Sequence, residues 1–178
     1  STLRLREVTT NPPFESVVAR YGPTVLQVCM AVLGPDDADD AWAHTFLSAL
    51  ESYRDLTENG NIEAWLVTIA HRKVSELACH PSSREEPVGH GYDSVLPWAD
   101  VRNLDLLSAM ATLQPAHRHV LAYHYIAGLP YADIAIIMGG SLEATRQAAA
   151  EGIVILFRNY PQPPIGGSAF SDTPGGAR

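Results

Sequence analysis

The sequence predicts an all-α protein made of two small helical domains joined by a flexible linker. Apolar residues recur every three or four positions in two blocks, residues 14–80 and 104–160, as the buried face of a helix requires. Residues 81–103 lose this periodicity and are rich in Pro, Ser, Gly and charged residues, which is typical of a linker. No segment shows the alternation of a half-buried strand. Residues 1–13 are expected to form a mobile arm, and the Pro- and Gly-rich residues 161–178 a disordered tail.

Three helices are expected in the first block. The first begins at Phe14, and Gly22-Pro23 is expected to bend or break it before it ends at Gly34-Pro35. The second runs from about Asp36 to Tyr53 and begins with four aspartates in five positions, which suit the positive end of the helix dipole. The third follows the Asn59-Gly60 turn, from Ile62 to about His80.

The second block has the proportions of a helix-turn-helix unit. Helical patterns begin at Leu104 and at Pro115, and a short helix is expected after Pro130. The run Gly139-Gly140-Ser141 predicts a tight turn, with Ser141 as the N-cap of a last helix that reaches about Arg158. From this spacing alone, a DNA-reading unit and a plain helical hairpin fit equally well.

Composition excludes several functional classes. No apolar run is long or uninterrupted enough for a membrane span, and no leader-like segment opens the chain. Two distant cysteines, Cys29 and Cys79, suit a reducing cytoplasm. No catalytic fingerprint or zinc-ligand spacing occurs, so we expect a non-enzyme without a metal or cofactor. The net charge of −8, with a single lysine, gives no general attraction to nucleic acid.

The order of several short motifs resembles a known family. Residues 37–41 (Asp-Ala-Asp-Asp-Ala) with Thr45-Phe46 resemble the acidic region 2 helix of bacterial sigma factors of the extracytoplasmic-function (ECF) type. Residues 64–73 resemble the next helix of region 2, and residues 113–121 the start of region 4. Residues 128–135 resemble the first helix of the region 4 helix-turn-helix. Residues 141–152 fall where the family has its −35-recognition helix.

This resemblance implies specific partners and sites. RNA polymerase core is the expected partner of the acidic helix, through Asp36, Asp37, Asp39, Asp40 and His44. Promoter DNA is the expected partner of two further helices, through Arg72, Lys73, Ser141, Thr145, Arg146 and Gln147. The acidic surface also suits a basic partner such as an anti-sigma factor. A cytoplasmic protein that directs promoter-specific transcription initiation, without membrane contact, is the resulting expectation.

The sequence departs from the family where DNA contacts belong. The third helix ends in Glu76-Leu77-Ala78-Cys79-His80 rather than in arginines, and residues 141–160 hold two bases and two acids. The recognition helix is therefore degenerate, and DNA binding by the isolated chain is expected to be weak because phosphate contacts supply much of the affinity. Two functions remain open: a working sigma factor, and a sigma mimic that has lost its DNA contacts and binds an anti-sigma factor or polymerase.

Overall fold

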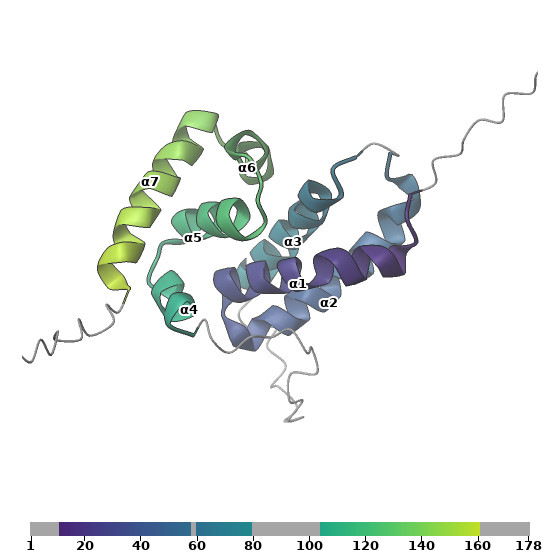
Figure 1. Ribbon diagram of the computed structural model, residues 1–178, viewed down its shortest axis with the longest axis horizontal. Coiled ribbons are helices and arrows are strands. Elements are labelled where there is room, and N and C mark those ends of the chain that lie inside the picture. The colour runs from purple at the N-terminus through teal and green to yellow at the C-terminus, as the bar shows by residue number, and fades with distance from the viewer. Residues whose placement is uncertain (1–10, 58–59, 80–103, 161–178) are drawn as a thin grey trace, which may run out of the picture.

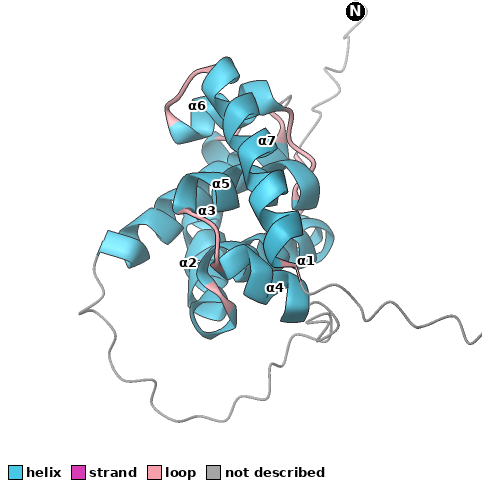
Figure 2. Ribbon diagram, turned by 90° about the vertical axis from the view of Figure 1, so that its left-hand side faces the viewer, coloured by secondary structure: helices cyan, strands magenta, loops and turns pink. Residues whose placement is uncertain are grey.

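The computed structural model describes residues 11–57, 60–79 and 104–160, and within these ranges it contains helices and no strand (Figures 1 and 2). The N-terminal unit holds α1 (Phe14–Leu33), α2 (Pro35–Ser52), a short 3-10 turn η1 (Tyr53–Asp55) and α3 (Ile62–Cys79). The C-terminal unit holds α4 (Leu104–Ala111), α5 (Pro115–Leu121), a π-helical turn η4 (Ala122–Ile126), α6 (Tyr131–Met138) and α7 (Leu142–Asn159). The predicted all-α class is confirmed.

Most of the segments predicted to flank the two domains are not among the residues that the structure describes. Residues 1–10 of the expected arm, the expected linker 81–103 and the expected tail 161–178 lie outside the described residues. Residues 11–13 are described, and Asn11 and Pro12 form hydrogen bonds with the segment that follows α2. The Asn11 side chain donates to the Leu56 carbonyl (3.0 Å), and the Tyr53 hydroxyl donates to the Pro12 carbonyl.

Helix α1 continues through Pro23, so of the predicted bend or break at Gly22-Pro23 the break does not occur. Pro23 has no amide to donate to the Ala19 carbonyl four residues earlier, so packing against neighbouring elements has to offset the lost helix hydrogen bond. Here α2 lies along this part of α1: the Trp42 indole Nε1 donates to the Gly22 carbonyl at 2.9 Å. The indole packs closely over this backbone: a Cβ at position 22 would lie 3.5 Å from Trp42 Cζ2, an ordinary van der Waals contact.

Helix α1 also has the length and apolar composition of a membrane span, with a mean hydropathy of 1.3, contrary to the sequence-based expectation. Its buried side chains instead enter the protein core, because both units pack against it. Length and composition alone do not separate a span from a core helix. The packing around α1 therefore accounts for its apolar character.

The N-terminal unit has a core of its own, which we call the N-terminal core. It consists of buried side chains from α1, α2 and α3: Val17, Val25, Leu26, Cys29, Ala38, Ala41, Phe46, Ala49, Leu66, Ile69 and Ala70. Aromatic rings close its outer end, with Trp42 and Phe46 at a centroid distance of 4.8 Å and Phe14 and Tyr53 at 5.2 Å. Such pairs add about 0.5–1.5 kcal/mol beyond burial.

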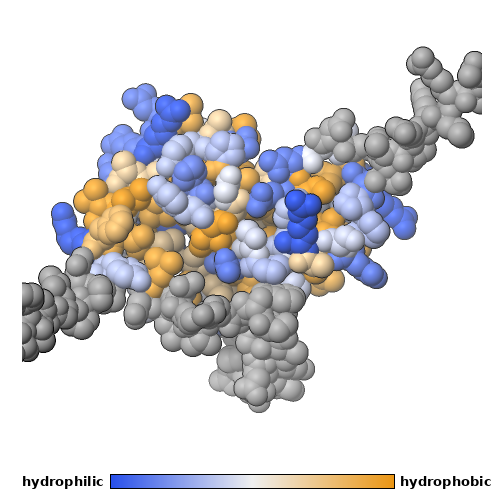
Figure 3. Space-filling model, in the orientation of Figure 1, coloured by the Kyte–Doolittle hydropathy of each residue, from blue (hydrophilic) through white to orange (hydrophobic). Residues whose placement is uncertain are grey.

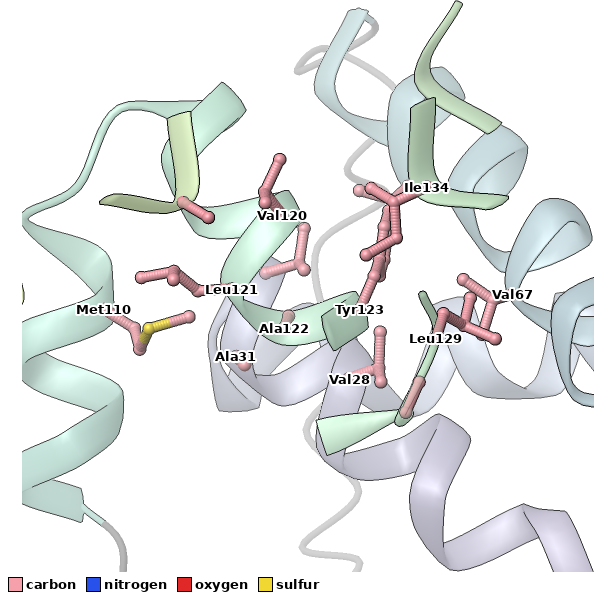
Figure 4. Close-up of a cluster of buried hydrophobic side chains, with 14 of the residues drawn as sticks. Val28, Ala31, Val67, Met110, Val120, Leu121, Ala122, Tyr123, Leu129 and Ile134 are labelled. Carbon is pink, nitrogen blue, oxygen red and sulfur yellow. The ribbon is translucent and has the colours of Figure 1, made fainter. Parts of the chain in front are cut away.

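A second core, which we call the shared core, contains side chains from both units (Figure 4). The N-terminal unit contributes Val28, Ala31, Val32, Val67 and Val74. The C-terminal unit contributes Met110, Leu113, Val120, Leu121, Ala122, Tyr123, Ala127, Leu129, Ile134 and Ala149. Helices α1 and α3 are therefore buried on two faces, one toward each core. The two units form one packed body, which the sequence did not predict.

Glycines set the path of the chain in the C-terminal unit. Gly128 and Gly139 have φ values of 73° and 72°, in the left-handed region that L side chains rarely adopt. Gly139 ends α6, and Ser141 then caps α7 by accepting a hydrogen bond from the Ala144 amide at 3.1 Å, as predicted. Gly152 lies where α7 crosses α5: a Cβ there would come within 3.1 Å of Leu121 Cδ1 and 3.2 Å of His117 Cβ.

Candidate functional surfaces

An acidic surface covers the start of α2. Asp36, Asp39 and Asp40 are exposed, whereas the neighbouring Ala38 and Ala41 are fully buried. The helical period thus places the carboxylates on the solvent face and the alanines on the core face. Pro35 begins the helix, and two aspartates lie in its first turn. Asp37 is half-buried and makes an interaction of its own, and His44 is exposed one turn beyond Asp40. We call Asp36, Asp39, Asp40 and His44 the acidic surface.

The two predicted DNA-contacting bases of α3 differ in availability. Arg72 is exposed, while Lys73 is half-buried and its Nζ lies 3.4 Å from Glu76 Oε2, one turn on. An exposed ion pair of this kind contributes about 0–1 kcal/mol, so Lys73 can change partners at little cost. Both bases lie on the helix that also carries Trp65, which is half-buried against Tyr53.

At the start of α7, one predicted contact residue points inward. Thr145 is 5% exposed, and its Oγ1 donates to the Ser141 carbonyl at 2.9 Å. Its role in any DNA contact is therefore to hold the first turn, together with the Ser141 cap. Ser141, Arg146 and Gln147 are exposed. The amides of this first turn and Arg146 are the groups here whose charge suits an anion.

Further along α7, the outward face is occupied by its own interactions. The Gln147 side chain donates to Glu151 Oε1 at 3.0 Å, and His117 Nε2 of α5 lies 3.2 Å from Glu151 Oε2. The hydrogen bonds from Gln147 and then from His117 lower the pKa of Glu151, so its carboxylate is charged at neutral pH. A fixed negative charge beside Gln147 repels phosphate, which weakens this part of the helix as a DNA contact.

Arg118 joins the two units through main-chain carbonyls. Its guanidinium donates to the carbonyls of Met110, Ala111 and Leu113 at 3.0, 3.2 and 2.7 Å. These carbonyls lie at the end of α4 and just after it. It also donates to the Val32 carbonyl in the last turn of α1, at 2.9 Å. Burial lowers the pKa of Arg118, but a guanidinium stays protonated in proteins. Sequence reasoning placed Arg118 only in a family motif and missed this connection.

A second polar connection lies beside the shared core. His71 Nδ1 of α3 is 2.7 Å from the Tyr123 hydroxyl of η4. The His119 ring of α5 stacks on Tyr123 at 5.8 Å and meets the His71 ring edge-on at 5.3 Å. We call His71, His119 and Tyr123 the histidine cluster. No sequence pattern signalled it, because its members come from two blocks and lie within apolar stripes.

An apolar groove with a volume of about 430 Å³ runs between the units. Helix α1 forms one wall with Leu26, Met30 and Ala31, and α4 and α7 form the other with Leu107, Met110 and Leu156. Figure 3 shows apolar side chains gathered over the C-terminal unit. Among the groove residues, Tyr125 and Phe157 are 61% and 70% exposed. Large apolar and aromatic side chains that are exposed to solvent in this way indicate a protein-binding surface.

Among the described residues, no metal site and no reactive buried thiol is found. They contain no group of three or more His, Cys, Asp or Glu side chains placed to hold a metal ion. Burial raises the pKa of the Cys29 thiol to about 12, so it is protonated at neutral pH and a poor nucleophile.

Two protein-family models match this chain, one in each unit. The model of sigma-70 region 2 matches residues 17–77, and the model of sigma-70 region 4 matches residues 109–156. Together these two regions account for more than half of the chain. The chain belongs to the sigma-70 family. Its region 2 corresponds to α1–α3 and its region 4 to α4–α7.

A curated relative extends the comparison. The ECF RNA polymerase sigma factor BldN of Streptomyces coelicolor is 29% identical over 161 residues, which are 83% of this chain and 60% of that protein. The chain therefore spans about 60% of the length of this relative.

Two solved structures share the fold. The structure of RpoE in complex with the anti-sigma factor NepR from Bartonella quintana has a TM-score of 0.65 at 16% identity, covering 82% of this chain and 95% of that one. The structure of CnrH in complex with the cytosolic domain of CnrY has a TM-score of 0.60 at 22% identity, covering 82% and 85%.

Proposed function

We propose that this chain is a cytoplasmic, non-catalytic transcription factor of the ECF type that binds RNA polymerase core and directs promoter-specific initiation. The single observation that carries the proposal is the presence of regions 2 and 4 in order, with the acidic surface exposed on α2. A cluster of carboxylates over a buried apolar seam is complementary to a basic partner. It attracts that partner without any change in the fold.

In this proposal, DNA contacts are few and depend on the polymerase. Arg72 and Lys73 of α3 face the promoter in region 2, and Arg146 and Gln147 of α7 face it in region 4. The first turn of α7, held by Ser141 and Thr145, supplies amide donors for a phosphate. With so few charged contacts, the isolated chain binds duplex DNA in the non-specific range, about 10⁻⁴–10⁻⁶ M at physiological salt.

The test of polymerase binding is a comparison of two charge-matched variants. Asp39→Lys with Asp40→Lys reverses two charges in the acidic surface, and Glu15→Lys with Glu51→Lys reverses two exposed charges outside it. We expect the first pair to weaken binding to purified core at least tenfold, with unchanged helical content. The second pair should bind within about twofold of the parent. Equal affinities for both pairs would remove the acidic surface from the proposal.

The test of promoter function is made with core enzyme present. Arg72→Ala with Lys73→Ala, and separately Arg146→Ala, are assayed for promoter opening. We expect loss of opening with retained core binding. Because Arg158 is exposed at the far end of α7, Arg158→Ala serves as the control for removing a base from the same helix.

A second candidate function rests on the outward face of α7. The Gln147–Glu151–His117 interactions occupy the positions where a recognition helix would present free polar groups. A sigma mimic would keep the fold and bind an anti-sigma factor, for which the apolar groove and the acidic surface are the candidate sites. Failure of the parent chain to open any promoter with core, together with tight anti-sigma binding, would favour the mimic.

A further inference from the structure

The histidine cluster lies at the contact between regions 2 and 4, and the proposed binding surfaces do not use it. His71 comes from α3 of region 2, and His119 and Tyr123 come from α5 and η4 of region 4. Both histidines are only partly exposed, and Tyr123 is fully buried beside Ile134 of α6 (Figure 4). Region 4 packing thus encloses two groups that titrate near neutral pH when they are in water.

We propose that the histidine cluster is a pH-sensitive latch between the two regions, closed when His71 and His119 are neutral and opened when they take up protons. The inference rests on the packed fold and is independent of the proposed function. When the latch opens, α2 and α3 on one side and α7 on the other are free to move apart, and the shared core is exposed to solvent.

The hydrogen bond across the contact depends on the neutral state. Burial raises the pKa of Tyr123, so its phenol keeps the proton and donates to His71 Nδ1. A neutral imidazole has one free ring nitrogen and accepts this bond. A protonated imidazole has none, because both nitrogens then carry protons. Protonation of His71 therefore removes the acceptor on the region 2 side.

The surroundings of His119 also disfavour a positive charge. Of the elements packed around the cluster, α1 presents Cys29 near Tyr123, α3 presents His71, α5 presents Arg118 and α6 presents the apolar Ile134. Among the described residues, the charged groups that act on His119 are His71 and Arg118, and both are cationic when charged. A second proton at the cluster would therefore place like charges together in a buried site.

The direction of the pH dependence follows from linkage. Burial, and then His71 and Arg118, lower the pKa of His119 to about 4 from its ordinary value of 6.5. Burial also lowers the pKa of His71. The closed form thus binds protons less readily than the open form, so closure is most stable above pH 6.5 and weakens as the pH falls toward 4. For His119 alone, linkage increases the open-to-closed ratio about fourfold at pH 6 and about thirtyfold at pH 5.

The experiment uses the full chain and three thiols. Ala31→Cys places a thiol in the shared core, at a position that is 4% exposed and borders the groove. Exposed Cys79 gives the reference rate for a small disulfide reagent at each pH, and Cys29, buried in the N-terminal core, reports unfolding of region 2. When closing is faster than labelling, the rate at the introduced thiol divided by the rate at Cys79 measures the open fraction.

We expect this ratio to increase about thirtyfold from pH 8 to pH 5 while the Cys29 rate, relative to Cys79, stays unchanged. In the Ala31→Cys background, His119→Leu should reduce the increase to less than about fivefold, because the apolar side chain takes up no proton. His44→Gln, an exposed histidine on α2, should leave the increase intact. A pH-independent ratio, an equal increase in His119→Leu, or a parallel increase at Cys29 would overturn the proposal.

A second measurement does not depend on the folding of the His119 variant. NMR of the His119 ring in the parent chain should give a titration midpoint well below 6.5. Tyr123→Phe removes the hydroxyl that donates to His71 Nδ1 and keeps the ring, so the titration midpoint of His71 should rise in that variant. A midpoint near 6.5 in the parent chain would contradict the latch, whatever the thiol rates.

Discussion

The two cores of the molecule differ in what completes them. The N-terminal core is built from α1, α2 and α3 alone, and its aromatic rings close one end of it. The shared core is built from region 4 but also contains five buried side chains of region 2. Region 2 therefore holds a complete core, whereas region 4 relies on its neighbour for part of its burial.

This difference matters because small helical units have little stability to spare. Each buried aliphatic side chain contributes roughly 1.5–3 kcal/mol, while whole domains are stable by only about 5–15 kcal/mol. Loss of the region 2 side chains from the shared core would therefore remove a large part of the stability of region 4. Loss of region 4 would leave the N-terminal core unaltered. The following variants test this asymmetry.

The largest effect is expected from Leu66→Ala. Leu66 is fully buried in the N-terminal core, and truncation of such a side chain lowers the free energy of unfolding by about 2–5 kcal/mol. Because region 4 packs on region 2, thermal melting should remain a single transition at a lower temperature. Two separate transitions, with region 4 unchanged, would show that region 4 does not need region 2.

Arg118→Met should have the next largest effect, about 2–3 kcal/mol, because hydrogen bonds from a charged group to carbonyls are lost. The methionine keeps the packing of the aliphatic chain. Hydrogen exchange should increase in α4, which holds two of the four acceptor carbonyls, and in α5, which holds Arg118. It should also increase in the last turn of α1, which holds the Val32 carbonyl. Unchanged exchange in α1 would contradict a connection through the Val32 carbonyl.

Val67→Ala should cost about 2 kcal/mol through two lost methyl groups. Val67 neighbours Leu66 in sequence, yet it lies in the shared core. The two substitutions therefore form a matched pair on one helix. Hydrogen exchange in Val67→Ala should increase in α5 and η4 and stay unchanged in α2. Faster exchange in α2 would mean that the two cores are not separable.

The smallest effect is expected from Ser141→Ala, which removes the hydrogen bond to the Ala144 amide and costs about 1 kcal/mol. The loss should be confined to the first turn of α7. Ser141→Asp, which keeps an acceptor, should restore the stability measured by chemical denaturation. A change in α3 exchange would indicate coupling that the present packing does not provide.

The sequence predicted those features that depend on neighbouring residues. The boundaries of α2, α3 and α7 follow from Pro35, the Asn59-Gly60 turn and the Ser141 cap, and each lies within a few residues of its prediction. The exposure of Asp39 and Asp40 follows from helical period alone. Motif order was enough to indicate the family. These are local signals, and one sequence contains them in full.

The sequence did not predict features that depend on contacts between the two blocks. Leu66 and Val67 are both apolar and adjacent, so periodicity cannot say that they enter different cores. His71 looks like any polar residue in an apolar stripe until Tyr123, 52 residues later, comes within hydrogen-bond distance. Thr145 lies on a predicted reading helix, and only the packing of α7 shows that it points inward.

The crossing of α5 and α7 at Gly152 also controls where Arg146 is aimed. Any side chain at 152 would meet Leu121 and His117 at about 3 Å, so α7 would have to lift away from α5 by some tenths of an ångström. Arg146 lies six residues earlier, about 9 Å along the helix axis from this pivot. A tilt at Gly152 would move the Arg146 guanidinium sideways by a similar few tenths of an ångström. A displacement of that size is enough to lose a bidentate contact. In this chain, the residue without a side chain sets the angle at which Arg146, the one base at the front of α7, projects from the fold.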